Sequence, residues 1–213
     1  MWRVGIDVGG TFTDLFGWNS ESQEQTEAKV LTTKDRSVGV VEAVEKSGIK
    51  FSEVSHLIHG TTTATNTLIQ RSYPPAAMIA TRGFRDSIEI GRQHRKHLYD
   101  PYQTKPKPII PRRYRFEVEE RINVNGDVVR PLDHEEVKTV ALKIKDLGIK
   151  SVAVCFVNSY VNSSHEEAVF QILQDIYPEV RAVTSASTRP IFREHGRFST
   201  TAIRAVLLPV MSE

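Results

Sequence analysis

The chain has one cysteine among its 213 residues, Cys155, so it holds no internal disulfide. The run SVAVCFV around it is apolar, which predicts a buried structural thiol in a reducing compartment. No apolar run approaches the roughly 20 residues that cross a bilayer. Asp7 also interrupts the apolar stretch that a signal peptide would need at the N-terminus. We therefore expect a cytoplasmic protein with no membrane partner.

The sequence also lacks an excess of charge of either sign. Its 28 basic and 26 acidic residues give a formal net charge of +2. Such a balance does not recruit nucleic acid or an anionic membrane surface. The length and an apolar fraction of 39% suit one generous globular domain or two small ones.

The first third of the sequence reads as short strands followed by helices. WRVGIDVG, TFTDLFGW and QTEAKVLTT predict an antiparallel meander. Valines at helical spacing after Ser37, a candidate N-cap, predict a helix that ends at Gly48. VSHLIHG predicts a strand that runs into TTTATNTLIQR, and AAMIATRG predicts another buried strand. This β-β-β-α-β-α-β order predicts a mixed α/β sheet within residues 1–92.

Residues 93–131 form a second portion that is rich in proline. HRKHLYDPYQTKPKPIIPRR predicts a long surface loop, because proline lacks a backbone donor and fixes an extended φ. RYRFEVEERINVNGDVVRPLD predicts a two-stranded hairpin that turns at Asn125-Gly126.

Residues 132–213 form the third portion. Asp133 and Glu136 resemble a capping box at the start of a helix that ends at Gly148. Its predicted apolar stripe is Val137, Val140, Ala141, Ile144 and Leu147. KSVAVCFV, a helix from Ser164 and EVRAVTS then predict a βαβ unit with parallel strands, and a C-terminal helix follows.

The stretch GIDVGGTFTDL places polar residues inside an apolar, strand-like run. Period-two alternation predicts that Val4, Ile6 and Val8 face the core while Asp7 faces the other way. Polar groups could therefore gather at the mouth of a hairpin.

Gly9 and Gly10 would let an anion approach backbone amides with no Cβ in its way. With the hydroxyls of Thr11 and Thr13, they predict a phosphate-binding turn. Asp7 would then lie close enough to bind Mg²⁺, directly or through water. The alternative is a structural glycine turn in which Asp7 bonds locally. No Gly-Lys-Ser/Thr follows, so this is not a P-loop.

GIDVGGTFTD resembles the first phosphate motif of the actin, sugar-kinase and heat-shock ATPase superfamily, in the form typical of the hydantoinase A and 5-oxoprolinase family. HGTTTATNTLIQR, TRGFRDSIEIGRQHRKHLYD and PRRYRFEVEERINVNGDVVRPLD resemble that family in the same order. The resemblance covers essentially the whole chain. NSYVNSSHE departs from it at Ser163 or Ser164, where the family has proline, and FREHGRFSTT departs from it around His195. The resemblance implies a ribonuclease H-like mixed sheet with an inserted or appended βαβ subdomain.

The second motif, HGTTTATN, places three threonines and an asparagine after a predicted strand. A strand-to-helix junction offers free amide donors and the positive end of a helix dipole. We therefore expect Gly60, Thr61, Thr62 and Asn66 to meet a second anion or a carbonyl oxygen. His59 either polarises a substrate or bonds to backbone.

Arg92 follows Gly91 at the predicted end of a helix. It could clamp a carboxylate or phosphate of the substrate, or it could be an ordinary exposed arginine. Three metal-like residues lie in a charged, proline-rich stretch that predicts solvated side chains: His94, His97 and Asp100. Weaker candidates for the site are Arg193, Thr200 and Thr201.

The resemblance implies ATP-dependent opening of a cyclic amide such as a hydantoin or 5-oxoproline, with ATP and Mg²⁺ as cofactors. Its catalytic candidates are Asp7, His59, Thr61, Thr62 and Asn66. A subunit of an ATP-dependent ketone carboxylase and a non-catalytic binding module of the same fold remain alternatives. No second DVGGT-like stretch occurs. We therefore expect an N-terminal portion that needs a second ATPase domain or a partner subunit, and an oligomer.

Overall fold

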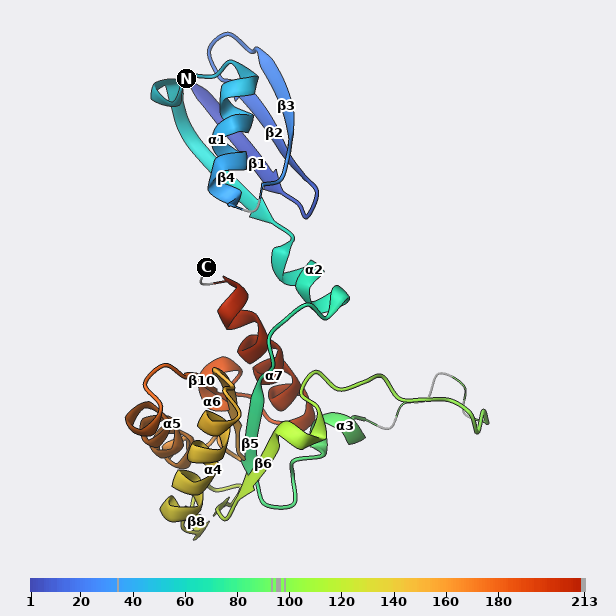
Figure 1. Cartoon of the computed structure of the whole chain (residues 1–213), viewed down its shortest axis with the longest axis vertical. Helices are drawn as coiled ribbons and strands as arrows, with labels where there is room; N and C mark the ends of the chain where they lie inside the picture. The colour runs from blue at the N-terminus through green and yellow to red at the C-terminus, as the bar shows by residue number, and fades with distance from the viewer. Residues whose placement is uncertain (34, 93, 95–96, 98, 212–213) are drawn as a thin grey trace. The chain divides into compact units, whose positions relative to one another are not determined.

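The computed structural model describes residues 1–33, 35–92, 94, 97 and 99–211. The chain forms two compact units, Met1–Ser72 and Tyr73–Glu213, each with its own sheet and hydrophobic core (Figure 1). Both antiparallel and parallel strand pairs occur, which confirms the predicted mixed α/β class. Across the described ranges, no helix combines the length and the apolar character that crossing a lipid bilayer requires.

The unit Met1–Ser72 is a four-stranded sheet with a helix on one face. Its strands run in the order β3-β2-β1-β4: β3 (Gln25–Leu31), β2 (Phe12–Asn19), β1 (Trp2–Val8) and β4 (Val54–Thr61). The first three form the predicted antiparallel meander, and β4 pairs parallel with β1. The helix α1 (Arg36–Ser47) packs on β1, β2 and β3. A 3-10 turn (Phe51–Glu53) precedes β4, and α2 (Thr63–Gln70) follows it.

The ends of α1 show why this segment is helical. The Asp35 carboxylate accepts a hydrogen bond from the Ser37 backbone amide at 3.0 Å, so Asp35 is the N-cap. The prediction of Ser37 as the N-cap was wrong by two residues, because Ser37 lies within the first turn of the helix. The predicted end is confirmed, since Gly48 takes the left-handed conformation with φ of 77°.

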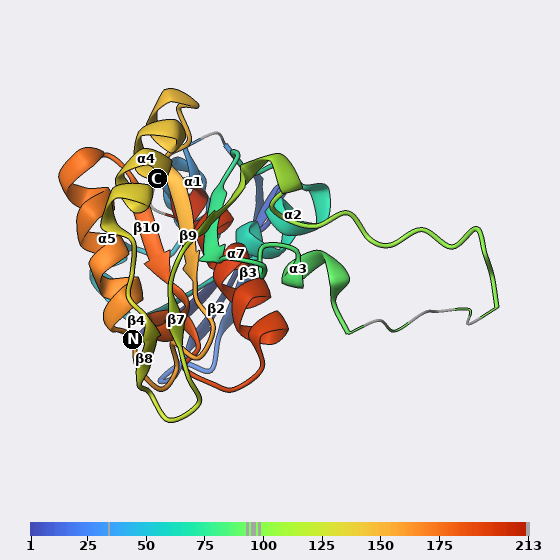
Figure 2. The same ribbon diagram turned by 90° about the horizontal axis from the view of Figure 1, so that it is seen from below.

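The unit Tyr73–Glu213 is a parallel sheet between helices. Its strands run in the order β10-β9-β5-β6: β10 (Arg181–Thr184), β9 (Ser151–Cys155), β5 (Ala77–Thr81) and β6 (Arg115–Val118). Helices α4 (His134–Asp146) and α5 (Ser164–Ile176) lie together on one side, while α7 (Glu194–Met211) packs on β9 and β10 from the other (Figure 2). The shorter elements are α3 (Ser87–Ile90), a 3-10 turn (Arg112–Tyr114), β7 (Arg121–Ile122), β8 (Val128–Arg130) and α6 (Ser185–Thr188).

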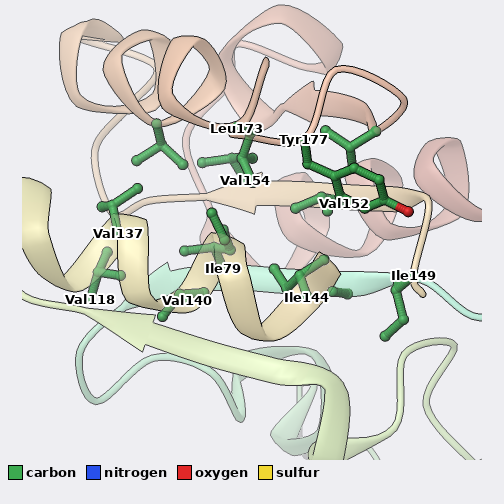
Figure 3. Packing of buried hydrophobic residues seen from close by; sticks show 14 of the residues in the cluster. Ile79, Val118, Val137, Val140, Ile144, Ile149, Val152, Val154, Leu173 and Tyr177 are labelled. Carbon is green, nitrogen blue, oxygen red and sulfur yellow. The ribbon is translucent and has the colours of Figure 1, made fainter. Parts of the chain in front are cut away.

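The main core fills the space between the sheet and α4 with α5. Figure 3 shows Val140 and Ile144 of α4 and Leu173 of α5 meeting Val152 and Val154 of β9. Alternation along β9 sends Cys155 to the other face, where it lies fully buried, as predicted.

The stripe of α4 ends earlier than the sequence indicated. Leu147 is 52% exposed, because the helix ends there and the chain turns away at Gly148. Asp133 caps the helix as predicted, accepting from the amides of Glu135 and Glu136.

Two strands lie in other places than the sequence suggested. β5 pairs with β9 and β6, so the chain divides after Ser72 and not after Arg92. β6 also joins this parallel sheet, which leaves the hairpin at Asn125-Gly126 with only β7 and β8.

Two fully buried charged side chains tie together the loops of this unit. Glu166 accepts from the Phe156 amide at 2.7 Å and the Ser185 hydroxyl at 2.6 Å through one oxygen, and from the Ala186 amide at 2.9 Å through the other. Arg197 donates to the Phe156 carbonyl at 2.8 Å and to the Ser185 hydroxyl at 3.0 Å. The end of β9 and the starts of α6 and α7 are therefore held as one group.

Candidate functional site

The turn between β1 and β2 forms the mouth of a hairpin. The Gly9 amide donates to the Phe12 carbonyl at 2.9 Å and closes this turn. Gly10 and Thr11 lie exposed at its tip. A Cβ on Gly10 would meet only Asn66 Nδ2, at 3.6 Å, so a ligand can approach the backbone of the tip.

Asp7 lies exposed on the face of the sheet opposite α1. In the strand register it stands between Asp14 of β2 and Gly60 of β4. A Cβ on Gly60 would lie 3.6 Å from Asp7 Oδ1, so the glycine leaves room beside the carboxylate. Among the ion pairs between described residues, Asp14 pairs with Lys29 at 2.9 Å and Asp7 takes part in none.

Asp14 is a member of this site that the sequence analysis missed. Asp7 and Asp14 are directly opposite each other across an antiparallel pair, so both carboxylates belong to the same face. The alternation of polar and apolar residues in FTDLFGW predicts the face on which Asp14 lies, but only when the register of the hairpin is known.

Thr13 does not lie at the mouth, in contrast to its predicted place beside Thr11. Val8 pairs with Thr13, so both face α1, and Thr13 is fully buried. Its hydroxyl lies 3.1 Å from that of Thr32, which in turn donates to the Gly9 carbonyl at 3.0 Å. Thr13 therefore supports the turn from behind, and Thr11 carries the exposed hydroxyl.

The junction of β4 with α2 adjoins this turn. The Thr61 hydroxyl donates to the Val8 carbonyl at 3.3 Å, which fixes the end of β4 against β1. Asn66 Nδ2 donates to the Thr62 hydroxyl at 3.1 Å and lies beside Gly10. The fold thus brings the GIDVGGT and HGTTTATN motifs together.

His59 is exposed but lies away from this group. His59 stands beside Ile6 in the parallel register of β4 and β1. Side chains at this position point to the face of the sheet that α1 covers, where Ile6 is buried. The structure therefore separates His59 from Asp7, against the expectation that they share a site.

The remaining candidates lie in the unit Tyr73–Glu213. Arg92 is exposed and lines a cavity together with His94, Asp100 and His195. The described residues contain no group of three or more side chains placed to ligate a metal ion, and this includes His94, His97 and Asp100.

The weaker candidates on α7 have structural partners. The Thr201 hydroxyl is buried and donates to the Arg197 carbonyl at 2.8 Å. Thr200 donates to the Gly196 carbonyl at 2.8 Å. Arg193 is exposed, with φ of 83°.

Both the sequence and the structure of this chain are similar to those of known proteins. Residues 3–177 match the family described as the hydantoinase/oxoprolinase N-terminal region. The chain belongs to this family. The acetophenone carboxylase gamma subunit of Aromatoleum aromaticum is 34% identical over 96% of the chain, and the caprolactamase alpha subunit of Pseudomonas jessenii is 30% identical over 99%. The 5-oxoprolinase 1 of Arabidopsis thaliana is 28% identical over 99%.

Solved structures confirm the fold of the family member. The crystal structure of the ATP-dependent caprolactamase from Pseudomonas jessenii superposes with a TM-score of 0.84 and 29% identity over 99% of the chain. Nucleotide-free acetone carboxylase superposes with a TM-score of 0.87 at 23% identity. The chain spans about a third of these proteins, 32% of the caprolactamase chain and 33% of the acetone carboxylase chain.

Proposed function

We propose that this chain is the N-terminal, phosphate-binding part of an ATP-dependent enzyme that opens a cyclic amide. The observation that carries the proposal is the meeting of two motifs at the hairpin mouth. Asp7 lies beside Gly60, and the exposed tip at Gly10 lies beside Asn66. Open backbone, hydroxyl, amide and carboxylate groups at one place suit a magnesium nucleotide.

The turn residues would hold the phosphates. The backbone at Gly9 and Gly10 can approach phosphate oxygens closely, and the exposed Thr11 hydroxyl can donate to them. Thr13 contributes by holding Thr32, which bonds to Gly9, and makes no direct contact.

The carboxylates of the open face fit a magnesium ion. Mg²⁺ is usually bound through one or two carboxylates, several waters and substrate phosphates. Asp7 and Asp14 supply two carboxylates on one face of the sheet. Asp7 takes part in no ion pair between described residues, whereas Asp14 pairs with Lys29. The ion would neutralise charge on the transferred phosphoryl group.

The chemistry is the activation of an amide carbon. Transfer of the γ-phosphoryl group joins the oxygen of the amide tautomer to phosphorus and breaks the bond from phosphorus to the β-phosphate oxygen, releasing ADP. Water then adds to the activated carbon, the ring C–N bond breaks with a proton going to nitrogen, and a second water releases phosphate. Thr61, Thr62 and Asn66 would orient the substrate, and Gly60 would leave it room. His59, on the other face, takes no part.

A further domain or partner subunit completes the enzyme in this proposal. β4 lies at the edge of its sheet with Leu57 53% and Ile58 73% exposed, and its sequence VSHLIHGT carries no Asp, Glu, Lys or Arg. The opposite edge strand, β3, carries Glu27 and Lys29. Natural edge strands are usually blunted by charge, so an apolar edge indicates a surface that other protein covers. We propose that the enzyme acts in the cytoplasm, since buried Cys155 needs no oxidising compartment.

A ketone carboxylase subunit is the second candidate, favoured by the 34% identity to the acetophenone carboxylase gamma subunit. Phosphorylation of an enolisable ketone or of bicarbonate would use the same hairpin mouth. The substrates separate the two: a cyclic-amide hydrolase consumes ATP with a lactam alone, whereas a carboxylase needs ketone and bicarbonate together.

The test is the Asp7→Asn variant in the complete enzyme that contains this chain. We expect turnover coupled to ADP release to fall by at least about 100-fold, with an unchanged thermal unfolding curve, because Asp7 is exposed. The control is Glu42→Gln, which removes an exposed carboxylate from α1 and should keep wild-type rates. Wild-type turnover of Asp7→Asn at limiting Mg²⁺ would overturn the metal-binding role.

A further inference from the structure

We infer that Lys29 exchanges partners when the proposed nucleotide binds: its ammonium group leaves Asp14, which turns to the metal ion, and donates to a phosphate oxygen. The inference rests on the proposed function for the identity of the ligand, a magnesium nucleotide. It adds to that function a phosphate-binding cation that lies outside both motifs of the hairpin mouth.

Four residues form one row across the face of the first sheet that lies opposite α1. In the strand register, Lys29 of β3 stands opposite Asp14 of β2. Asp14 stands opposite Asp7 of β1, which in turn stands beside Gly60 of β4. Figure 1 shows these four strands side by side. A cavity of about 700 Å³ lies over the row and is lined by all four residues, so Lys29 shares one space with both carboxylates.

The ammonium group of Lys29 lies between this row and the hairpin mouth. Its Nζ atom is 2.9 Å from Asp14 Oδ1 and 5.1 Å from the centroid of the Phe12 ring. Phe12 comes two residues before Asp14, and its carbonyl accepts from the Gly9 amide in the turn. The ammonium group is therefore on the side of the row from which a phosphate held by the turn would approach.

The backbone of Lys29 is held in place while its side chain is exposed. Its carbonyl accepts from Lys46 Nζ of α1 at 2.8 Å. Directly after β3, the Thr32 amide donates to the Thr11 carbonyl at 2.9 Å, which ties this strand to the turn. The Lys29 side chain is 59% exposed and that of Asp14 is 53% exposed. Exposed ion pairs contribute little to stability, so an exchange of partners has a low cost.

The charges of the cavity favour a metal ion before an anion. Among the described residues that line it, Asp7, Asp14 and Glu27 carry carboxylates, and Lys29 carries an ammonium group. Asp7 and Asp14 stand directly opposite each other, where like charges repel. A divalent cation held by both carboxylates would relieve this repulsion and would take Asp14 from Lys29. A phosphate oxygen then offers Lys29 a new partner of opposite charge.

Metal binding and nucleotide binding by the full chain test this exchange, because Lys29→Gln should change the two affinities in opposite directions. Mn²⁺ is the metal probe, since carboxylates suit both Mg²⁺ and Mn²⁺ and electron paramagnetic resonance counts the unbound Mn²⁺. We expect Lys29→Gln to bind Mn²⁺ alone about threefold more tightly, because Asp14 loses its competing partner. Binding of ATP at saturating Mn²⁺, measured by calorimetry, should weaken about tenfold, because a phosphate loses a charged donor.

Two further variants serve as controls. Lys29→Arg keeps the positive charge, and its affinity for ATP should stay within about threefold of wild type. Lys50→Gln removes an exposed lysine that precedes β4, at the end of the sheet where Trp2 pairs with Val54. This change is far from the hairpin mouth along the strands and should alter neither affinity.

Weaker binding of both Mn²⁺ and ATP in Lys29→Gln would indicate a purely structural role and would overturn the exchange. Tighter binding of both would mean that Lys29 only competes with the metal, which would overturn it too. An unchanged affinity for either ligand, or a wild-type chain that binds no Mn²⁺, would have the same consequence. The Mn²⁺ measurement needs neither ATP nor turnover, so its failure is distinct from a failure of the proposed activity, which Asp7→Asn tests in the complete enzyme.

Discussion

Replacing Glu166 by glutamine tests the buried hydrogen-bond group that holds α6 and the end of β9. The change keeps the size of the side chain but replaces one acceptor oxygen by a donor NH₂ group. If the amide oxygen keeps the bonds from Phe156 and Ser185, the new nitrogen faces the Ala186 amide, which then has no acceptor. A buried donor left unpaired costs about 1–3 kcal/mol. The neutral amide is less costly to bury than a carboxylate, and we expect a net loss of about 2 kcal/mol at neutral pH.

The pH dependence of this loss has a definite sign. Burial raises the pKa of Glu166, and the hydrogen bonds from Ser185, Ala186 and Phe156 oppose this rise without cancelling it. Its contribution to stability is therefore fully present below the pKa of the unfolded chain and is lost as pH rises through the pKa of the folded state. The glutamine variant lacks this titration. The difference in free energy of unfolding between wild type and Glu166→Gln should therefore narrow as pH rises from about 4.5, the ordinary glutamate value.

The distribution of tryptophan provides an internal control for the assay. Both tryptophans, Trp2 and Trp18, lie in the unit Met1–Ser72, so their fluorescence in urea follows that unit. Far-UV circular dichroism follows the larger, helix-rich unit as well. We expect Glu166→Gln to shift the circular dichroism transition and to leave the fluorescence transition in place. The control is Glu167→Gln, which changes an exposed neighbour, and an equal loss of unfolding free energy in this variant would refute the reasoning. A difference in unfolding free energy between wild type and Glu166→Gln that widens as pH rises would refute it too.

Four further outcomes follow from local structure. Gly9→Ala should destabilise the hairpin, measured by tryptophan fluorescence, because its Cβ would lie 3.0 Å from the Phe12 carbonyl oxygen. Gly10→Ala, whose Cβ makes only ordinary contact, should change stability by less than about 0.5 kcal/mol while weakening ATP binding in a titration. Asp133→Ala removes the cap of α4 and should lower the free energy of unfolding by about 1 kcal/mol, measured by circular dichroism. Burial raises the pKa of the Cys155 thiol well above its usual value, so a thiol reagent should react with it only after unfolding.

The first sheet could be predicted from sequence because its signals are local. Alternation along β1 assigned Val4, Ile6 and Val8 to the core, and all three are buried. The place of Thr13 could not be predicted in the same way. A glycine pair permits turns of different length, and the turn length fixes which residues pair across the hairpin. The Gly9–Phe12 turn places Thr13 opposite Val8, which moves it to the core side.

The second sheet depends on long-range pairing that no local pattern specifies. β5 is a five-residue strand buried on both faces, and such a strand fits the interior of either sheet equally well. Its partners β9 and β6 are separated from it by more than thirty residues of chain, which include a proline-rich loop. The neighbourhood of Gly91 and His195 depends on the same packing, because α7 reaches α3 only once the parallel sheet has formed.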